Sequence, residues 1–218
     1  MNAEKLKIYL AADSTVQRYD EQEKHQGGWG EFLQDYFTDE VKVENHAIGG
    51  RSSKTFIEEG RLDKIAKKIK AGDFLLIQMG HNDAAKNKPE RYTEPFTTYK
   101  QYLKKYIDCA KSYQAEPVLI TPAARLHLEN NRFINDFPEY CQAMKEIAVE
   151  EDVALIDLME KSLNLFDRVG YQKAFTYFMA SVNDHDYTHF TKNGAKQMAR
   201  LVADGIKELE IKISHLMK

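Results

Sequence analysis

The residues most able to perform chemistry fall in four short motifs along the chain. Asp-Ser-Thr occupies residues 13–15, Gly-Gly-Arg-Ser-Ser occupies 49–53, Gly-His-Asn-Asp occupies 80–83, and Asp-Tyr-Thr-His occupies 186–189. Each motif alone has an ordinary structural explanation, because serine caps helices and the Gly-Gly and Asn-Asp pairs favour turns. The four motifs could together form one reactive site if the fold brings them close to one another.

The chemistry that these residues suit is acyl transfer. A serine hydroxyl is a weak nucleophile near neutral pH and needs a base within hydrogen-bonding reach. His189 titrates in the right range to take the proton of Ser14 and later return it to the leaving alcohol. Asp186 precedes the histidine by three residues and could orient its ring and stabilise the imidazolium. The sequence therefore predicts Ser14, His189 and Asp186 as a catalytic triad.

Acyl transfer also needs donors for the oxyanion of the tetrahedral intermediate. The backbone N–H of Ser14 is one candidate. Gly50 offers a second N–H, and its lack of a Cβ lets a substrate approach closely. Asn82 offers a neutral amide, where an aspartate would repel the developing charge. We therefore expect these three residues to form an oxyanion hole.

The elements that must position these motifs alternate along the chain. Short apolar or alternating runs predict strands, whereas apolar residues at helical spacing predict helices. The predicted strands are 7–11, 41–45, 74–79, 117–121 and 154–157, and the predicted helices are 28–37, 62–70, 95–113, 139–149 and 192–209. This alternation indicates βαβ units, a parallel sheet and helices on both faces. Ligands bind beyond the carboxyl ends of such strands, where the first three motifs stand.

Composition excludes several other classes of protein. The 218 residues are 43% hydrophobic and 30% charged, which is typical of a globular chain rather than a disordered one. The formal net charge of −3 gives no general attraction to nucleic acid or to an anionic membrane. No apolar run approaches the ~20 residues of a membrane helix. The N-terminus lacks a signal-peptide pattern, so we expect a cytoplasmic location.

The four motifs, in this order, resemble the SGNH (GDSL-type) hydrolase superfamily. Within it, the chain is most similar to the rhamnogalacturonan acetylesterase-like group. The matching segments are residues 10–15, 28–31 (Gly-Trp-Gly-Glu), 50–53, 59–61 (Glu-Gly-Arg), 71–73, 80–83 and 186–190. The resemblance implies one flavodoxin-like, three-layer α/β/α domain over residues 1–218, with a central, mainly parallel sheet.

The resemblance also implies an activity. It implies Ser14 as nucleophile with Asp186 and His189, an oxyanion hole from Ser14, Gly50 and Asn82, deacetylation of pectic polysaccharides, and no cofactor. The chain departs from the family at Ala12, where glycine is usual, and we expect an altered turn before the nucleophile. Fungal members are secreted. Because this chain lacks a visible signal sequence, we expect acetylated oligosaccharides rather than the polymer as substrate.

Several other residues were candidates for contact with substrate. Arg51, Lys54 and Lys173 could meet galacturonate carboxylates, although most charged residues are simply solvated. His81 and Tyr187 stand inside the motifs and could contact substrate. The indole of Trp29 is better explained by core packing than by sugar stacking. A metal site at residues 184–189 is disfavoured, because the triad already accounts for the spacing.

Rival functions remain at this point. Other superfamily members act on longer acyl chains, so a lipase, thioesterase or lysophospholipase is one alternative. Another acetylated glycan, such as xylan or a sialic acid, is a second alternative. A non-catalytic carbohydrate-binding domain is a third, although every residue that catalysis requires is present. A dinucleotide-binding enzyme would need Gly-x-Gly-x-x-Gly after the first strand, where residues 13–15 stand instead.

Overall fold

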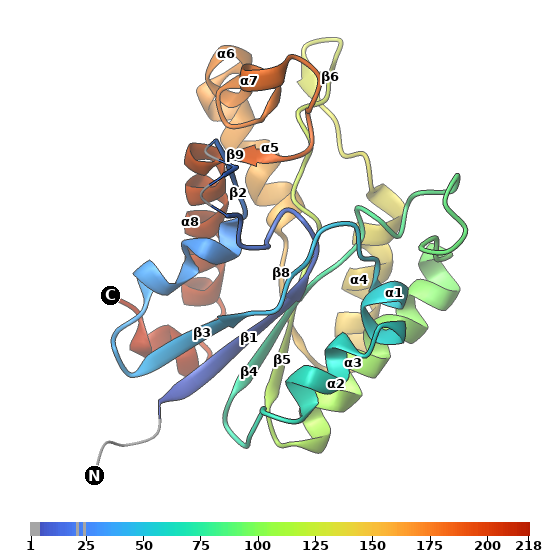
Figure 1. The fold of residues 1–218 in the computed structure, drawn as a ribbon, viewed down its shortest axis with the longest axis vertical. Helices are drawn as coiled ribbons and strands as arrows, with labels where there is room; N and C mark the ends of the chain where they lie inside the picture. The colour runs from blue at the N-terminus through green and yellow to red at the C-terminus, as the bar shows by residue number, and fades with distance from the viewer. Residues whose placement is uncertain (1–4, 21, 24) are drawn as a thin grey trace.

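The centre of the molecule is a five-stranded parallel sheet (Figure 1). The computed structural model describes residues 5–20, 22–23 and 25–218. The strand order is β3-β1-β4-β5-β8. The bounds of the strands are Leu6–Ala12 for β1, Val41–Asn45 for β3, Phe74–Gln78 for β4, Glu116–Ile120 for β5 and Ala154–Ile156 for β8.

The sheet forms as the apolar runs predict. β4 is buried along its whole length, as expected for a strand covered on both faces. β1 lies between β3 and β4, so that Leu10 is opposite Asn45 on one side and Leu76 on the other. Counting these five strands in chain order gives 2-1-3-4-5, which is the flavodoxin-like arrangement. The predicted α/β fold class is confirmed.

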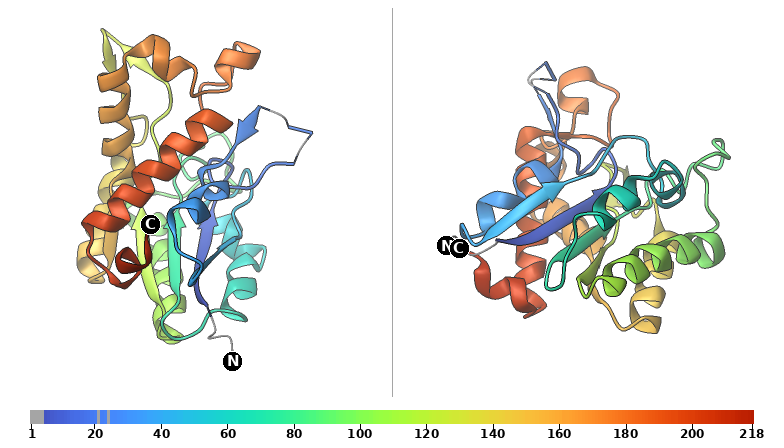
Figure 2. Two further views of the ribbon diagram at one scale, coloured as in Figure 1. Left: turned by 90° about the vertical axis from the view of Figure 1, so that its left-hand side faces the viewer. Right: turned by 60° about the horizontal axis from the view of Figure 1, so that its bottom comes forward.

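Helices cover both faces of the sheet and make three layers (Figures 1 and 2). One face carries the short 3₁₀ helices η1 (Trp29–Glu31) and η2 (Leu33–Tyr36) with α5 (Leu158–Val169) and α8 (Lys192–Glu208). The other face carries α1 (Ser53–Glu58), α2 (Arg61–Ala66), α3 (Lys100–Ser112) and α4 (Pro138–Glu150).

Shorter elements connect these layers. Two antiparallel pairs lie outside the main sheet, β2 (Gln26–Gly27) with β9 (Phe190–Thr191) and β6 (Leu128–Glu129) with β7 (Arg132–Phe133). The remaining helical turns are η3 (Pro95–Tyr99), α6 (Tyr171–Phe175), α7 (Ala180–Asn183) and η4 (Lys212–Leu216). The β2–β9 pair joins the chain just after the first motif to the chain just after the last one.

Parts of the helical prediction were wrong, and helix α1 (Ser53–Glu58) was not predicted. The segment 28–37 is two 3₁₀ helices rather than one α-helix, because Trp29 N–H donates to Thr15 O at 3.0 Å and ties the segment to another turn. Helix α5 was not predicted, although Asp157 caps its first turn by accepting from Glu160 N–H at 3.1 Å. The core placement of Trp29 is confirmed, since the residue is 1% exposed.

Two further expectations concern the N-terminal part of the chain. Ala12 continues β1 in regular pairing opposite Gln78, so its side chain is accommodated within the sheet. The expected cytoplasmic location depends partly on residues 1–4, which lie outside the described residues. Within the described ranges, no helix combines the length and apolar character that crossing a membrane requires.

Candidate active site

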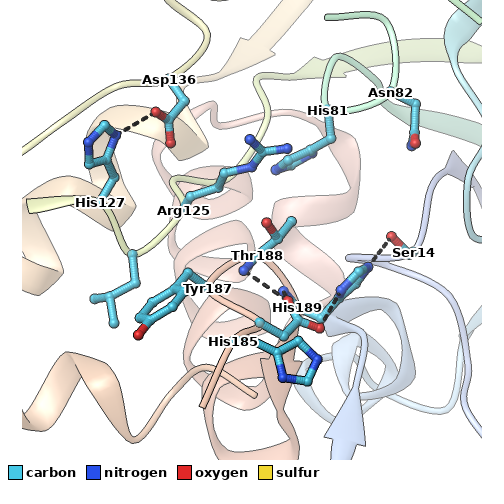
Figure 3. Close-up of a pocket in the computed structure, with 12 residues that line it drawn as sticks. Ser14, His81, Asn82, Arg125, His127, Asp136, His185, Tyr187, Thr188 and His189 are labelled. Carbon is cyan, nitrogen blue, oxygen red and sulfur yellow. Dashed lines mark hydrogen bonds and ion pairs between the residues drawn. The ribbon is translucent and has the colours of Figure 1, made fainter. Parts of the chain in front are cut away.

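The first, third and last motifs line one pocket at the carboxyl edge of the sheet, and the second lies beside it. The pocket has a volume of about 590 Å³, within the range of small-molecule sites. Its lining includes six of the residues singled out from the sequence, namely Ser14, His81, Asn82, Asp186, Tyr187 and His189 (Figure 3). This is the edge at which ligands bind in open α/β sheets.

Ser14, His189 and Asp186 form a continuous chain of hydrogen bonds. Ser14 Oγ lies 2.9 Å from His189 Nε2, and His189 Nδ1 lies 2.8 Å from Asp186 Oδ2. Because a carboxylate accepts from Nδ1–H, the network assigns Nε2 as the free acceptor for the serine proton. Burial raises the pKa of Asp186, but the backbone N–H and the imidazole of His189 outweigh burial and hold that pKa below its ordinary value.

The turn after β1 fixes the serine. Asp13 C=O accepts from the N–H groups of Val16 at 3.2 Å and Gln17 at 3.1 Å, which closes a tight turn around Ser14. The Tyr19 hydroxyl donates to Ser14 C=O at 2.7 Å. Gly28 packs against this turn so closely that a Cβ there would lie 2.2 Å from Gln17 O. The Gly-Trp-Gly-Glu segment is therefore part of the scaffold behind the nucleophile.

The loop between α7 and β9 fixes the acid and the base. Asp186 Oδ1 accepts from the N–H groups of Thr188 at 3.1 Å and His189 at 2.9 Å, which locks the loop in a compact turn. Its backbone is also held from outside, because Met179 N–H donates to His189 C=O at 2.8 Å. Thr191 then caps α8 by accepting from Gly194 N–H at 3.2 Å.

Three N–H groups near the Ser14 hydroxyl can serve as donors in an oxyanion hole. In the described part of the chain, the N–H groups of Ser14 and Gly50 have no hydrogen-bond acceptor. Gly50 has a φ of +79°, a conformation that favours glycine. The turn lies against the nucleophile, since a Cβ on Gly49 would be 3.4 Å from Ser14 Cβ. Asn82 Nδ2 donates to Arg51 C=O at 3.1 Å, which leaves its second amide proton free.

Arg91 orients the Asn82 amide and was missed from the sequence. Its Nη1 donates to Asn82 Oδ1 at 2.8 Å, so the amide oxygen faces the guanidinium and Nδ2 remains a donor. The same Nη1 lies 3.7 Å from the position that a Cβ on Gly50 would take. Arg91 therefore contacts both loops that carry oxyanion donors. No local pattern around residue 91 signals this contact.

His81 and Asp13 form a buried pair beneath the pocket. His81 Nδ1 lies 3.3 Å from Asp13 Oδ2, and His81 Nε2 lies 3.0 Å from Ala123 C=O. Burial raises the pKa of Asp13, but the nearby His81 ring and the hydrogen bonds from Thr15 outweigh it and lower that pKa. Both ring nitrogens of His81 face protein oxygens. The ring reaches the pocket wall, where we had expected a substrate contact, but its polar atoms are already directed inward.

Asp83 joins the two loops of the oxyanion region. It is fully buried and accepts from Ser53 N–H, Ser53 Oγ and the Thr93 hydroxyl. Burial raises the pKa of Asp83 to about 6, against the lowering effect of these hydrogen bonds. The residue thus clamps the start of α1, which follows Gly50, to the loop that contains Asn82.

The remaining candidates for substrate contact differ in whether they line the pocket. Tyr187 lines the pocket and is 41% exposed. Arg51, although described, does not line the pocket: its Nε contacts Glu59 Oε2 at 3.0 Å and its Nη1 donates to Gly49 C=O at 2.8 Å. Lys173 lies 5.9 Å from the ring of Tyr177. The basic residue at the pocket wall is instead Arg125, which was not a candidate.

The alternative of a metal site at residues 184–189 lacks a set of ligands among the described residues. Within these ranges, no group of three or more His, Cys, Asp or Glu side chains has an arrangement that could hold a metal ion. His185, the histidine next to the last motif, has its Nδ1 2.6 Å from Asn183 C=O. The acidic and basic groups nearby are engaged in the Asp186–His189 pair.

A family model described as GDSL-like Lipase/Acylhydrolase matches residues 9–202, so the chain belongs to this family of ester hydrolases, and the SGNH resemblance is confirmed. Among curated proteins, it is 61% identical over 207 residues to the probable rhamnogalacturonan acetylesterase YesY of Bacillus subtilis, covering 95% of each chain. It is 40% identical over 225 residues to the rhamnogalacturonan acetylesterase RhgT of the same organism, covering 97% of this chain and 94% of RhgT.

Solved structures agree on the fold. The structure of YxiM from Bacillus subtilis superposes with a TM-score of 0.86 at 28% identity, over 96% of this chain and 58% of that one. A catalytic mutant of Axe2, an acetylxylan esterase from Geobacillus stearothermophilus, superposes with a TM-score of 0.68 at 17% identity, over 94% of this chain and 96% of that one. The three-layer architecture is thus shared with esterases.

Proposed function

We propose that this chain is a serine carbohydrate O-acetylesterase that removes acetyl groups from pectic, rhamnogalacturonan-type oligosaccharides. The observation that carries the proposal is the chain of hydrogen bonds from Ser14 through His189 to Asp186. The names of YesY and RhgT support the substrate class. Because Ser14 and His189 are 175 residues apart in sequence, we also propose that residues 1–218 act as one catalytic domain.

In the acylation step, Ser14 Oγ attacks the acetyl carbonyl carbon while His189 Nε2 takes the hydroxyl proton. The 2.9 Å separation of these atoms suits direct proton transfer. The oxyanion accepts hydrogen bonds from the N–H groups of Ser14 and Gly50 and from Asn82 Nδ2. The intermediate then collapses, and the imidazolium gives its proton to the departing sugar oxygen. Asp186 stabilises the imidazolium throughout.

In the deacylation step, water attacks the carbonyl carbon of acetyl-Ser14. His189 takes a proton from the water, and the same three donors stabilise the second oxyanion. Collapse of this intermediate breaks the bond to Ser14 Oγ, releases acetate and returns the proton to the serine. The cycle requires no cofactor, because every proton that moves passes through His189.

The polar wall of the pocket supports a small acyl group on a polar alcohol. His127 and Asp136 line the side of the pocket away from Ser14, and Arg125 lies between His127 and His81 (Figure 3). A long acyl chain placed along this wall would desolvate charged groups without offering them hydrogen bonds, which is costly. A sugar offers hydroxyl groups to the same side chains. This difference favours the carbohydrate esterase over a lipase or lysophospholipase.

Hydrolysis of aryl esters and sugar esters tests the proposal. We expect Ser14→Ala to lower kcat for an aryl acetate by about 10⁴-fold or more, since loss of a triad member removes the nucleophile. Wild-type enzyme should prefer acetyl over octanoyl esters and should release acetate from acetylated rhamnogalacturonan fragments faster than from acetylated xylo-oligosaccharides. Retained activity in the Ser14 variant would overturn the mechanism. Preference for octanoyl esters would overturn the substrate class.

A further inference from the structure

Arg125 places a positive charge at the wall of the pocket. It lies in the loop between β5 and β6, and its side chain lines the pocket. Its Nε is buried and has no hydrogen-bond partner among the residues that the structure describes. Among the described residues, it forms no ion pair, and none of the proposed catalytic steps uses it. A buried donor without a partner costs free energy, so this arrangement calls for an explanation.

The two carboxylates that line the pocket, and Asp13 beneath it, each contact a histidine. Asp136 Oδ1 lies 2.6 Å from His127 Nδ1, Asp186 Oδ2 lies 2.8 Å from His189 Nδ1, and Asp13 Oδ2 lies 3.3 Å from His81 Nδ1. None of these three acids forms an ion pair with the guanidinium in the described part of the chain. An anion supplied by the ligand would give it such a partner, and the pocket has room to admit one.

The protein holds the guanidinium in a fixed place. Its central carbon lies 4.8 Å from the centre of the Phe137 ring, a cation–π contact. The His81 ring packs edge-on against the same phenyl ring at 4.9 Å, and Figure 3 shows the guanidinium beside His81. Leu126 N–H donates to Tyr187 C=O at 3.0 Å, which joins the loop of Arg125 to the loop of the triad. The charge is thus positioned relative to Ser14 before any substrate arrives.

We propose that Arg125 binds the carboxylate of a uronic acid residue in the acetylated oligosaccharide and thereby selects acidic over neutral glycans. This inference rests on the proposed function and adds a specificity residue to it. The two terminal amino groups of a guanidinium present parallel N–H bonds that match the two oxygens of a carboxylate. The hydroxyl groups of a neutral sugar do not match this fork and leave the charge uncompensated.

Competitive inhibition of aryl-acetate hydrolysis tests the proposal. The inhibitors are digalacturonate and its methyl ester, which differ in the carboxylate charge. We expect wild-type enzyme to bind the acid at least about tenfold more tightly than the ester, as one charge-assisted pair predicts. In Arg125→Met this ratio of inhibition constants should fall to near one. Arg125→Lys should recover part of it, because lysine keeps the charge and loses the fork.

Arg132→Met is the matched control, because it removes one exposed arginine, on strand β7, that does not line the pocket. Its inhibition ratio should equal that of wild type. A wild-type ratio near one, or a ratio in Arg125→Met that matches wild type, would overturn the proposal. Calorimetric titration of digalacturonate into Ser14→Ala, with and without Arg125→Met, measures the same recognition without turnover. Failure of the esterase function would therefore leave this binding difference intact.

Discussion

Arg91 should act on catalysis through Asn82 without touching the substrate. Replacing Arg91 with Met removes the 2.8 Å hydrogen bond that fixes the Asn82 amide oxygen. The 3.1 Å bond from Asn82 Nδ2 to Arg51 C=O remains and still opposes a flip of the amide. The variant thus keeps the donor but loses its strongest restraint and the nearby positive charge.

The loss of kcat in Arg91→Met should not exceed the loss caused by removing the Asn82 donor itself. Removal of one oxyanion donor costs about 10²–10³ in kcat, or about 3–4 kcal/mol. Because Arg51 C=O continues to orient the amide, we expect Arg91→Met to lose about 1.4 kcal/mol, which is about tenfold in kcat. KM for an aryl acetate should change little, since the oxyanion develops after the ester is bound.

A double-mutant cycle provides the decisive measurement. We expect Asn82→Ala to reduce kcat by about 10²–10³, and Arg91→Met to add almost nothing in that background. Arg200→Met, which removes an exposed arginine from α8, should match wild type, and unfolding temperatures identify any variant that is merely unstable. Additive losses from Asn82→Ala and Arg91→Met, or a change confined to KM, would refute the reasoning.

Two further predictions concern stability. The pKa of Asp83 rises to about 6 on folding, so near pH 5 the folded chain holds a proton that the unfolded chain releases. The contribution of Asp83 to the free energy of unfolding therefore falls as pH rises. From pH 4.5 to 6.5 that contribution falls by about 2 kcal/mol. In urea unfolding, the stability of wild type relative to Asp83→Asn should fall by that amount over the same pH range, and parallel pH profiles would contradict the prediction. Gly28→Ala should cost about 1–3 kcal/mol and lower kcat, since its Cβ would meet Gln17 O at 2.2 Å. Unfolding curves and aryl-acetate kinetics measure both effects, and unchanged values would show that the turn yields freely.

The sheet and the meeting of the motifs were predictable from the sequence because each depends on a simple pattern. A run such as 74–78 is apolar throughout, and that pattern alone indicates a strand buried on both faces. Parallel strands place their carboxyl ends at one edge, which is why Ser14 and Asn82 were expected together. His189, from the far end of the chain, was predicted by its chemistry as the base that Ser14 requires, and the family resemblance implies the same role.

The parts that were not predicted depend on contacts between distant segments. Arg91 and Arg125 sit in irregular loops, and their significance comes from Asn82, Phe137 and the pocket. Conversely, Arg51 follows Gly50 directly and looked available, but Glu59 and Gly49 occupy its guanidinium. Sequence proximity to a motif is a poor guide for long basic side chains, because their flexible stems reach whichever acceptor the fold provides.

Helix α5 is a different kind of omission, because its signals were present in the sequence. Asp157 stands at its N-cap, Gly170 follows its last residue, and Leu158, Ser162 and Phe166 recur on one buried face. The 28–37 segment shows the opposite error. Its apolar spacing is helical, but Gly28 and Gly30 pack directly against the nucleophile turn, and the tie from Trp29 N–H to Thr15 C=O overrides the local preference.

The pairing of β2 with β9 has a consequence for how the protein is made. This short ladder and the Ser14–His189 bond both join segments more than 150 residues apart, so they close one of the longest loops in the chain. We expect contacts over such a long separation in sequence to form slowly, because the loop must be closed before they gain any stabilisation. A nascent chain still attached to the ribosome at its C-terminus can build the strands before it can cleave an ester. The rate at which esterase activity returns during refolding should therefore report when the C-terminal segment docks, separately from when the sheet forms.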